Sequence, residues 1–241
     1  MALLLAAAGP PPSATPAARL DDPAWRARFA AKQVELRQKR PEVVFLGDSI
    51  FQNWEKQGGP AWDDYRPGWE RYFDRFDAVD LGFTGDTTAN LLWRVENGEL
   101  DAIHPKVAVV LIGINDFCGA GWSAGDTLAG IDAVLAAMRR RAPGTKILLL
   151  GLLPNGWCEA ARSGAASVDR ALAARHWAGS GVTYRDLSEL LAPHGVLDRS
   201  RFADPLFAVP GPPLHPTAQT QVRLAAAIAP AIAALLGAAA K

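Results

Sequence analysis

The chain has 241 residues, of which 49% are hydrophobic and 21% are charged, and its 25 basic residues balance its 25 acidic residues. This length and composition fit one large α/β core, so we expect a single domain over residues 22–241. The only long basic run, Arg139 to Arg141, has the position of a helix C-terminus. The neutral balance therefore gives no indication of nucleic acid as a partner.

Two cysteines, Cys118 and Cys158, are too few for a disulfide scaffold, and they lack the Cys/His spacing of a zinc site. We therefore expect no structural metal. Each cysteine follows an apolar run typical of a strand, so the two could lie on one rim of a sheet. They could form a disulfide in an oxidising compartment or remain as two free thiols.

Residues 1–21 are expected to lie outside the domain. Met1 to Ala8 form an apolar block, and a Pro/Ala/Ser stretch continues to Ala18, but no Lys or Arg precedes Arg19. The segment is interpreted either as a degraded signal peptide or as a disordered tail. We expect a periplasmic or secreted protein, with a cytoplasmic one as the alternative. No stable membrane insertion is expected, since no stretch outside this segment is judged apolar over enough residues to span a bilayer.

The pattern along the chain predicts alternating helices and strands. A helix from Asp22 to Arg40 is expected to pack Trp25, Phe29 and Val34. An apolar run from Val43 that stops at Gly47 predicts a buried parallel strand. Further strands are expected at 78–82, 107–112, 146–153 and 182–187, and further helices near 88–98, 123–142, 168–177 and 216–236. This alternation predicts one doubly wound parallel sheet with helices on both faces.

An aromatic segment over residues 51–76 is expected to form a loop and a helix. Phe51 and Trp54 are expected to pack in the core, with the wall of a substrate cleft as the alternative. The other aromatic residues are expected to pack in the core: Trp62, Trp69, Tyr72 and Phe73.

Three polar segments directly follow strands and should share one edge of the sheet, where open α/β sheets bind their ligands. They contain Ser49, Gly85 and Asn115. A serine hydroxyl that attacks an ester needs hydrogen-bond donors around the oxyanion that forms. The backbone N–H of Gly85, the amide of Asn115 and the N–H of Ser49 itself are groups of the right type.

The nucleophile also needs a base. His215 is the best placed of the four histidines, because it lies in a proline-flanked loop immediately before the last helix. His104 and His176 are expected at the surface or in packing, and His194 lies in a turn without a motif.

These residues resemble the four sequence blocks of the SGNH or GDSL-type hydrolases, over roughly residues 42–236. The blocks are Gly47-Asp48-Ser49, Thr84-Gly85-Asp86, Gly113-Ile114-Asn115-Asp116 and Leu214-His215-Pro216. Within that superfamily the chain is similar to the catalytic subunits of platelet-activating-factor acetylhydrolases and their bacterial relatives, through segments 84–94, 96–100 and 150–154.

The resemblance implies a flavodoxin-like three-layer α/β/α fold with strand order 2-1-3-4-5. It implies ester hydrolysis without a metal or cofactor. It assigns Ser49 as nucleophile, Gly85 and Asn115 as oxyanion donors, and His215 as general base and acid. The related acetylhydrolase subunits also suggest a homodimer.

The chain departs from the family pattern at one position. The family usually has an aspartate three residues before the histidine, and here that residue is Pro212. Our preferred hypothesis is a Ser49–His215 dyad oriented by the main-chain carbonyl of Pro212. Asp204 or Asp198, upstream in the same loop, is the alternative orienting group.

The predicted function is a serine esterase that hydrolyses small acetyl or short-chain carboxylic esters through an acyl-enzyme, so the expected partner is a small-molecule ester. A lysophospholipase or thioesterase is the nearest enzymatic alternative. A catalytically weak SGNH-like binding module is the alternative from another class.

Overall fold

Five parallel strands form one sheet in the computed structural model, which describes residues 9–58, 63–206 and 209–237. The order β2-β1-β3-β4-β5 confirms the predicted one. The strands are β1 (Val43–Gly47), β2 (Ala78–Gly82), β3 (Val107–Leu111), β4 (Lys146–Leu150) and β5 (Val182–Arg185).

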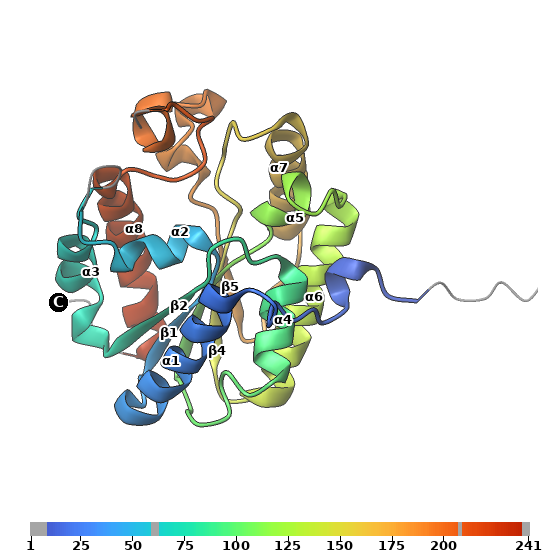
Figure 1. Ribbon diagram of the computed structural model, residues 1–241, viewed down its shortest axis with the longest axis vertical. Helices are drawn as coiled ribbons and strands as arrows, with labels where there is room; N and C mark the ends of the chain where they lie inside the picture. The colour runs from blue at the N-terminus through green and yellow to red at the C-terminus, as the bar shows by residue number, and fades with distance from the viewer. Residues whose placement is uncertain (1–8, 59–62, 207–208, 238–241) are drawn as a thin grey trace, which may run out of the picture.

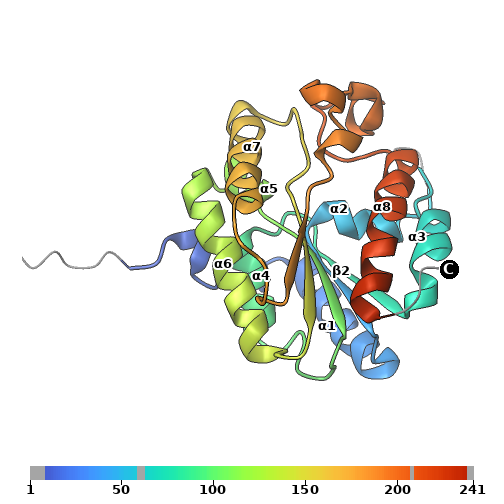
Figure 2. The same cartoon turned by 180° about the vertical axis from the view of Figure 1, so that it is seen from behind.

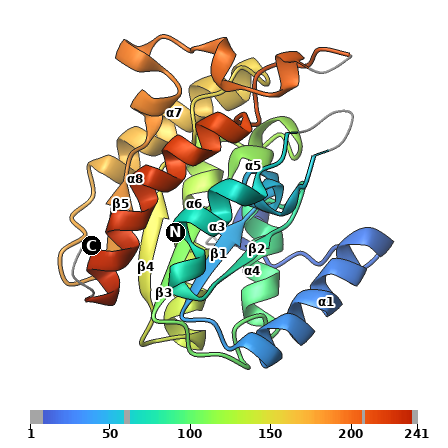
Figure 3. The same cartoon turned by 90° about the vertical axis from the view of Figure 1, so that its left-hand side faces the viewer.

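Helices cover both faces of this sheet, as predicted (Figures 1 and 2). One face carries α4 (Thr88–Glu96), α5 (Ile114–Cys118), α6 (Ala124–Arg141) and α7 (Glu159–Ala173). The other carries α3 (Arg66–Tyr72) and α8 (Ala218–Leu236), while α1 (Pro23–Lys39) lies beside β2 and α2 (Ser49–Gln52) follows β1 (Figure 3). Short 3-10 turns lie at Pro12–Ala14, Asn53–Glu55, Asp74–Phe76, Ser188–Leu190, Pro193–Gly195, Arg199–Arg201 and Asp204–Leu206.

The core is built on strands β1 and β3, in which every residue is buried. Phe45 of β1 packs against Phe51 and Phe73, with ring centroids 5.2 and 4.6 Å apart. Phe51 and Trp54 are each only 2% exposed. The hypothesis that these two residues wall a substrate cleft is therefore wrong, because their rings fill the core. Trp62 lies outside the described residues.

Two helices differ from their sequence-based expectations. In α1, Val34 is 47% exposed, and the helix instead buries Lys32 and Leu36. Helix α7 spans Glu159–Ala173, so it begins nine residues before the predicted helical segment 168–177 and ends before Trp177. Its first turns contain small residues rather than a large apolar stripe, and Gly164 lies where a Cβ atom would clash with the ring of Phe117. Close packing of small residues leaves no periodic signal of large side chains.

The described part of the N-terminal segment, residues 9–21, packs against the domain. The turn Pro12–Ala14 lies against α4 and α6, and Ser13 is fully buried. The Ser13 hydroxyl donates to the carbonyl of Asp126 at 2.6 Å, and its carbonyl accepts from the Thr88 hydroxyl at 3.1 Å. The apolar block Met1 to Ala8 lies outside the described residues.

Helix α8 is long and apolar enough to cross a membrane when judged by length and composition alone. It also packs against β3, β4 and α3, and Leu224, Ile228 and Ile232 are buried there. The expectation that only the N-terminus is apolar for long enough overlooked this helix, which serves as a core helix in this fold.

A disulfide joins Cys118 and Cys158, whose Cα atoms are 6.4 Å apart. Cys118 ends α5, and Cys158 is the residue that precedes α7. The structure therefore decides the question that the sequence left open, and it connects two helices on the same face of the sheet.

We expect this disulfide to stabilise the fold, because it closes a sequence separation of 40 residues. The Cys118→Ala/Cys158→Ala variant should lose about 2–4 kcal/mol of unfolding free energy, measured in guanidinium chloride. Treatment with a reductant should lower the wild-type midpoint and leave that of the variant unchanged. Native wild-type protein with two titratable thiols would contradict the assignment.

Candidate active site

Ser49 lies at the point where β1 passes into α2. Asp48 caps this short helix, accepting a hydrogen bond from the backbone N–H of Ile50 at 2.9 Å. Gly47, the last residue of β1, is paired in register with Gly82 of β2 and Leu111 of β3. The chain segments that follow these three strands therefore meet at one edge of the sheet, as the sequence predicts for Ser49, Gly85 and Asn115.

The structure brings His215 to Ser49 from the loop before α8. The hydroxyl of Ser49 lies 2.9 Å from Nε2 of His215. The other ring nitrogen, Nδ1, lies 2.7 Å from Oδ1 of Asp204. The second carboxylate oxygen of Asp204 accepts from the backbone N–H groups of Leu214 and His215, at 2.9 and 2.6 Å. A serine, a histidine and an aspartate are thus joined in a continuous chain of hydrogen bonds.

The hypothesis that the Pro212 carbonyl orients the imidazole is wrong, because Asp204 is the hydrogen-bond partner of Nδ1. Asp198 does not take this role either, since its carboxylate accepts hydrogen bonds from Ser200 and Arg201. Asp204 precedes His215 by 11 residues. The segment between them is rich in proline and apolar residues, and Asp204 is the last carboxylate before His215, which was the available signal in the sequence.

Asp204 is held in its charged form. Burial raises the pKa of its carboxyl, but hydrogen bonds from the ring and backbone of His215 outweigh burial and keep the pKa below its usual value. An ionised carboxylate beside Nδ1 fixes the tautomer in which Nε2 can accept the serine proton, and it stabilises the imidazolium that forms.

Gly85 and Asn115 follow β2 and β3 at the same edge of the sheet as Ser49. Gly85 has a φ of +79°, a left-handed conformation that favours glycine. The side-chain amide of Asn115 donates one hydrogen bond to the carbonyl of Asp86, at 2.9 Å. Its second amide hydrogen is left to donate elsewhere. Both residues have the donor chemistry required of an oxyanion hole.

A buried ion cluster supports the same edge, and the sequence reasoning did not assign it a role. The guanidinium of Arg94 binds the carboxylates of Asp86 and Glu99, and all three side chains are fully buried. Arg94 also donates to the carbonyls of Gly47 and Leu81 at 3.1 and 3.2 Å. The sequence signal was the position of both acids near Arg94, within the segments that carry the family resemblance.

The other histidines lie away from this constellation in exposed positions, as predicted for His104 and His176. His194 is 94% exposed in its side chain and adopts a left-handed φ of 55°.

Comparison with known proteins shows the family to which this chain belongs. The sequence profile of the GDSL-like Lipase/Acylhydrolase family matches residues 45–223, from β1 into α8. The chain belongs to this family. Carboxylic ester hydrolysis, the predicted enzyme class, is the chemistry that the family name describes, and the predicted resemblance is confirmed.

Relatives of this GDSL-family protein include the platelet-activating factor acetylhydrolase IB subunit alpha2 of Homo sapiens, with 35% identity over 148 residues. That alignment covers 60% of this chain and 59% of the relative, so the chain spans about three fifths of the curated protein it matches.

Solved structures share the fold at low sequence identity. A GDSL-like lipase from Bacteroides thetaiotaomicron has a TM-score of 0.65 at 16% identity, covering 86% of this chain and 96% of that one. A carbohydrate acetylesterase from Sinorhizobium meliloti has a TM-score of 0.59 at 16% identity, covering 80% of this chain and 98% of that one.

We expect Asp204→Asn to lower kcat/KM for an ester by roughly 10³–10⁴, because an amide holds the imidazole in the wrong tautomer. Asp198→Asn is the matched control, since it removes a carboxylate from the same loop without touching His215. Circular dichroism should show both variants folded. Equal activity of the two variants would contradict the role of Asp204.

Asp48 should make stability depend on pH. Burial, with a smaller contribution from the charges of Asp86 and Asp116, raises the pKa of Asp48 to about 7. Between the unfolded value near 4 and this value, the folded state holds a proton that the unfolded state has lost. The folded state is therefore destabilised as the pH rises through this window.

Asp48→Asn should accordingly gain stability relative to the wild type as the pH rises from about 4 to about 7. Thermal unfolding midpoints measured across this range test it, with the exposed Asp74→Asn as control. A difference between Asp48→Asn and wild type that stays constant with pH would show that Asp48 does not titrate as described.

Proposed function

We propose that the protein is a serine esterase that hydrolyses small carboxylic esters through an acyl-enzyme. The observation that carries the proposal is the continuous hydrogen-bond chain from Ser49 through His215 to Asp204. It lies at the sheet edge that also presents Gly85 and Asn115. In place of the dyad expected from the sequence, we assign a triad in which the acid comes from an unusual position upstream.

The mechanism follows from these contacts. Nε2 of His215 takes the proton of the Ser49 hydroxyl as its oxygen attacks the ester carbonyl carbon. The N–H groups of Gly85 and Ser49 and the amide of Asn115 donate to the oxyanion. His215 then gives the proton to the departing alcohol, leaving an acyl group on Ser49. His215 takes a proton from a water molecule as the water oxygen attacks the acyl-enzyme, and it then gives this proton to the Ser49 oxygen as the acid leaves.

We propose acetyl or other short-chain esters as substrates. The names of the two most informative similar proteins, a platelet-activating factor acetylhydrolase subunit and a carbohydrate acetylesterase, both specify an acetyl group. The two names specify different kinds of molecule that carry the acetyl group. The comparison therefore supports the acyl group of the substrate rather than its alcohol. The charged partner of His215 favours an active hydrolase over a catalytically weak binding module.

We also propose that the protein works in the periplasm or outside the cell. The disulfide between Cys118 and Cys158 supports this location, because disulfides persist in oxidising compartments and are rare in the cytosol.

The direct test is hydrolysis of a series of p-nitrophenyl esters from acetate to octanoate by the wild type and by Ser49→Ala. We expect kcat/KM to be highest for acetate and to fall with chain length. Ser49→Ala should lose turnover of every ester, because it removes the attacking oxygen.

A fluorophosphonate probe gives an independent measurement. It should label the wild type at a stoichiometry of one, and mass spectrometry should place the label on Ser49. Hydrolysis that survives Ser49→Ala would contradict the mechanism. Folded wild type that neither hydrolyses an ester nor takes the label would favour the binding module.

A further inference from the structure

The N-terminal segment crosses the loop that contains Gly85. Its backbone is anchored to α4, where the N–H of Ala17 donates to the carbonyl of Ala89 at 3.1 Å. The side chain of Asn90 donates in return to the carbonyl of Ala17 at 2.8 Å. These contacts place Arg19, two residues later, beside the turn between β2 and α4.

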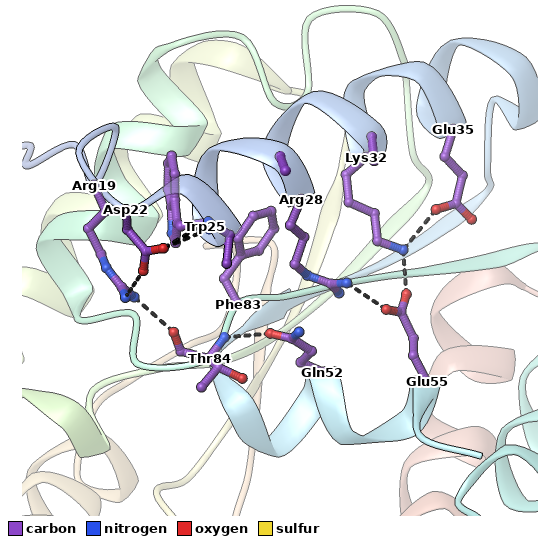
Figure 4. Close-up of a pocket in the computed structure, with 13 residues that line it drawn as sticks. Arg19, Asp22, Trp25, Arg28, Lys32, Glu35, Gln52, Glu55, Phe83 and Thr84 are labelled. Atoms are coloured by element: carbon purple, nitrogen blue, oxygen red, sulfur yellow. Dashed lines mark hydrogen bonds and ion pairs between the residues drawn. The ribbon is translucent and has the colours of Figure 1, made fainter.

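Arg19 binds both residues that flank Gly85. Its Nη1 donates to the carbonyl of Thr84 at 2.8 Å and to Oδ1 of Asp86 at 3.2 Å. Its Nη2 donates to Asp22 at 2.9 Å, and Asp22 caps α1 (Figure 4). The guanidinium is therefore fixed by both of its terminal nitrogens, between the first helix and the Gly85 turn.

The bond to Thr84 acts on the peptide group that supplies the Gly85 N–H. The Thr84 carbonyl and the Gly85 N–H belong to one planar unit, and all described peptide bonds are trans. In a trans peptide the carbonyl and the N–H point in opposite directions. By holding the carbonyl from the α1 side, Arg19 directs the N–H away from that helix.

The Gly85 N–H is left available for a ligand. Within the part of the chain that the structure describes, it donates to no protein acceptor. The neighbouring N–H of Thr84 is occupied by Oε1 of Gln52, at 2.6 Å (Figure 4). A Cβ atom on Gly85 would lie 3.2 Å from Nη1 of Arg19, so the guanidinium covers the glycine closely on that side.

We propose that Arg19 is a positioning residue for the oxyanion hole, which it aligns and polarises through the Thr84–Gly85 peptide. This inference rests on the proposed function, in which the Gly85 N–H donates to the oxyanion. The N-terminal segment then contributes a positioning residue to the active site of the domain.

Polarisation adds to alignment. A cationic donor on a carbonyl draws electron density from the amide and strengthens its N–H as a donor, as in other chains of coupled hydrogen bonds. The side chain of Arg19 is 28% exposed, so its charge is only partly screened by solvent. The effect should be largest when negative charge develops on the substrate oxygen, in the transition state rather than in the bound substrate.

Arg19→Ala tests the proposal in the full chain, with p-nitrophenyl acetate as substrate. We expect kcat to fall about ten- to hundredfold while KM stays nearly unchanged, since a misdirected donor weakens the transition state. Arg19→Lys should fall between wild type and Arg19→Ala, because an ammonium group can replace only part of the planar fork. Asn115→Ala serves as the positive control and should lose about 10²–10³ in kcat.

Arg26→Ala is the matched negative control, since Arg26 also binds a carbonyl of the N-terminal segment, that of Leu20, but does not touch the Gly85 turn. The rate of phosphonylation by the fluorophosphonate should fall in parallel with kcat for Arg19→Ala and remain at the wild-type level for Arg26→Ala. All rates are measured well below the unfolding midpoint of each variant.

The inference would be overturned if Arg19→Ala and Arg19→Lys had the same kcat as Arg26→Ala, even if both were less stable to heat. The proposed function would then remain intact. A rise in KM with unchanged kcat would also overturn it, because Arg19 would then serve substrate binding. Ester hydrolysis that does not depend on Ser49 would instead refute the proposed function, which the Ser49→Ala control detects separately.

Discussion

The buried ion cluster around the guanidinium of Arg94 is the interaction on which the carboxyl edge of the sheet depends. The guanidinium binds Asp86 and Glu99, and it donates to the last carbonyl of β1 and to a carbonyl near the end of β2. Removing one member of such a cluster would leave a buried charge without a partner, at a cost of about 3–5 kcal/mol. The ends of β1 and β2 therefore have little freedom to move relative to each other. Ser49 follows the end of β1 and Gly85 follows the end of β2 within a few residues. Their backbones are therefore held in place by the same cluster.

The proposed oxyanion donors, Gly85 and Asn115, are held from several directions. Asp86 accepts hydrogen bonds from Arg19, Trp25 and Arg94 through its carboxylate, and from Asn115 through its carbonyl. A single residue thus connects the Gly85 turn with the amide of Asn115. At the other end of α5 the disulfide attaches Cys118 to the start of α7. In the proposed mechanism, donors fixed in this way need no rearrangement when the oxyanion forms, which is the physical basis of electrostatic preorganisation.

His215 is positioned by a different part of the chain. Phe202 and Pro216 form an isolated antiparallel bridge, and the N–H of Ala203 donates to the carbonyl of His215 at 2.8 Å. This bridge brings Asp204 beside Nδ1 of His215, although 11 positions separate the two residues in sequence. The 3-10 turns between β5 and α8 lie over the carboxyl edge of the sheet (Figure 1). Asp204 belongs to the last of these turns, and His215 follows it and contacts Ser49. The position of the carboxylate beside His215 is therefore set by the path of this loop rather than by a fixed spacing in the sequence.

The amino-acid sequence by itself determined the sheet, its strand order through the family resemblance, and the residues Ser49, Gly85, Asn115 and His215 that meet at its edge. The strands and the places of Ser49, Gly85 and Asn115 follow from local patterns, since an apolar run predicts its own strand and the next polar residues must lie at the strand's end. His215 was predicted from its place in the loop before the last helix. Only the tertiary structure decided the partner of His215, the pairing of the cysteines and the place of Arg19. These are contacts between segments without periodicity, separated by 11, 40 and 65 residues. Their formation depends on the path of loops, which no local pattern of side chains encodes.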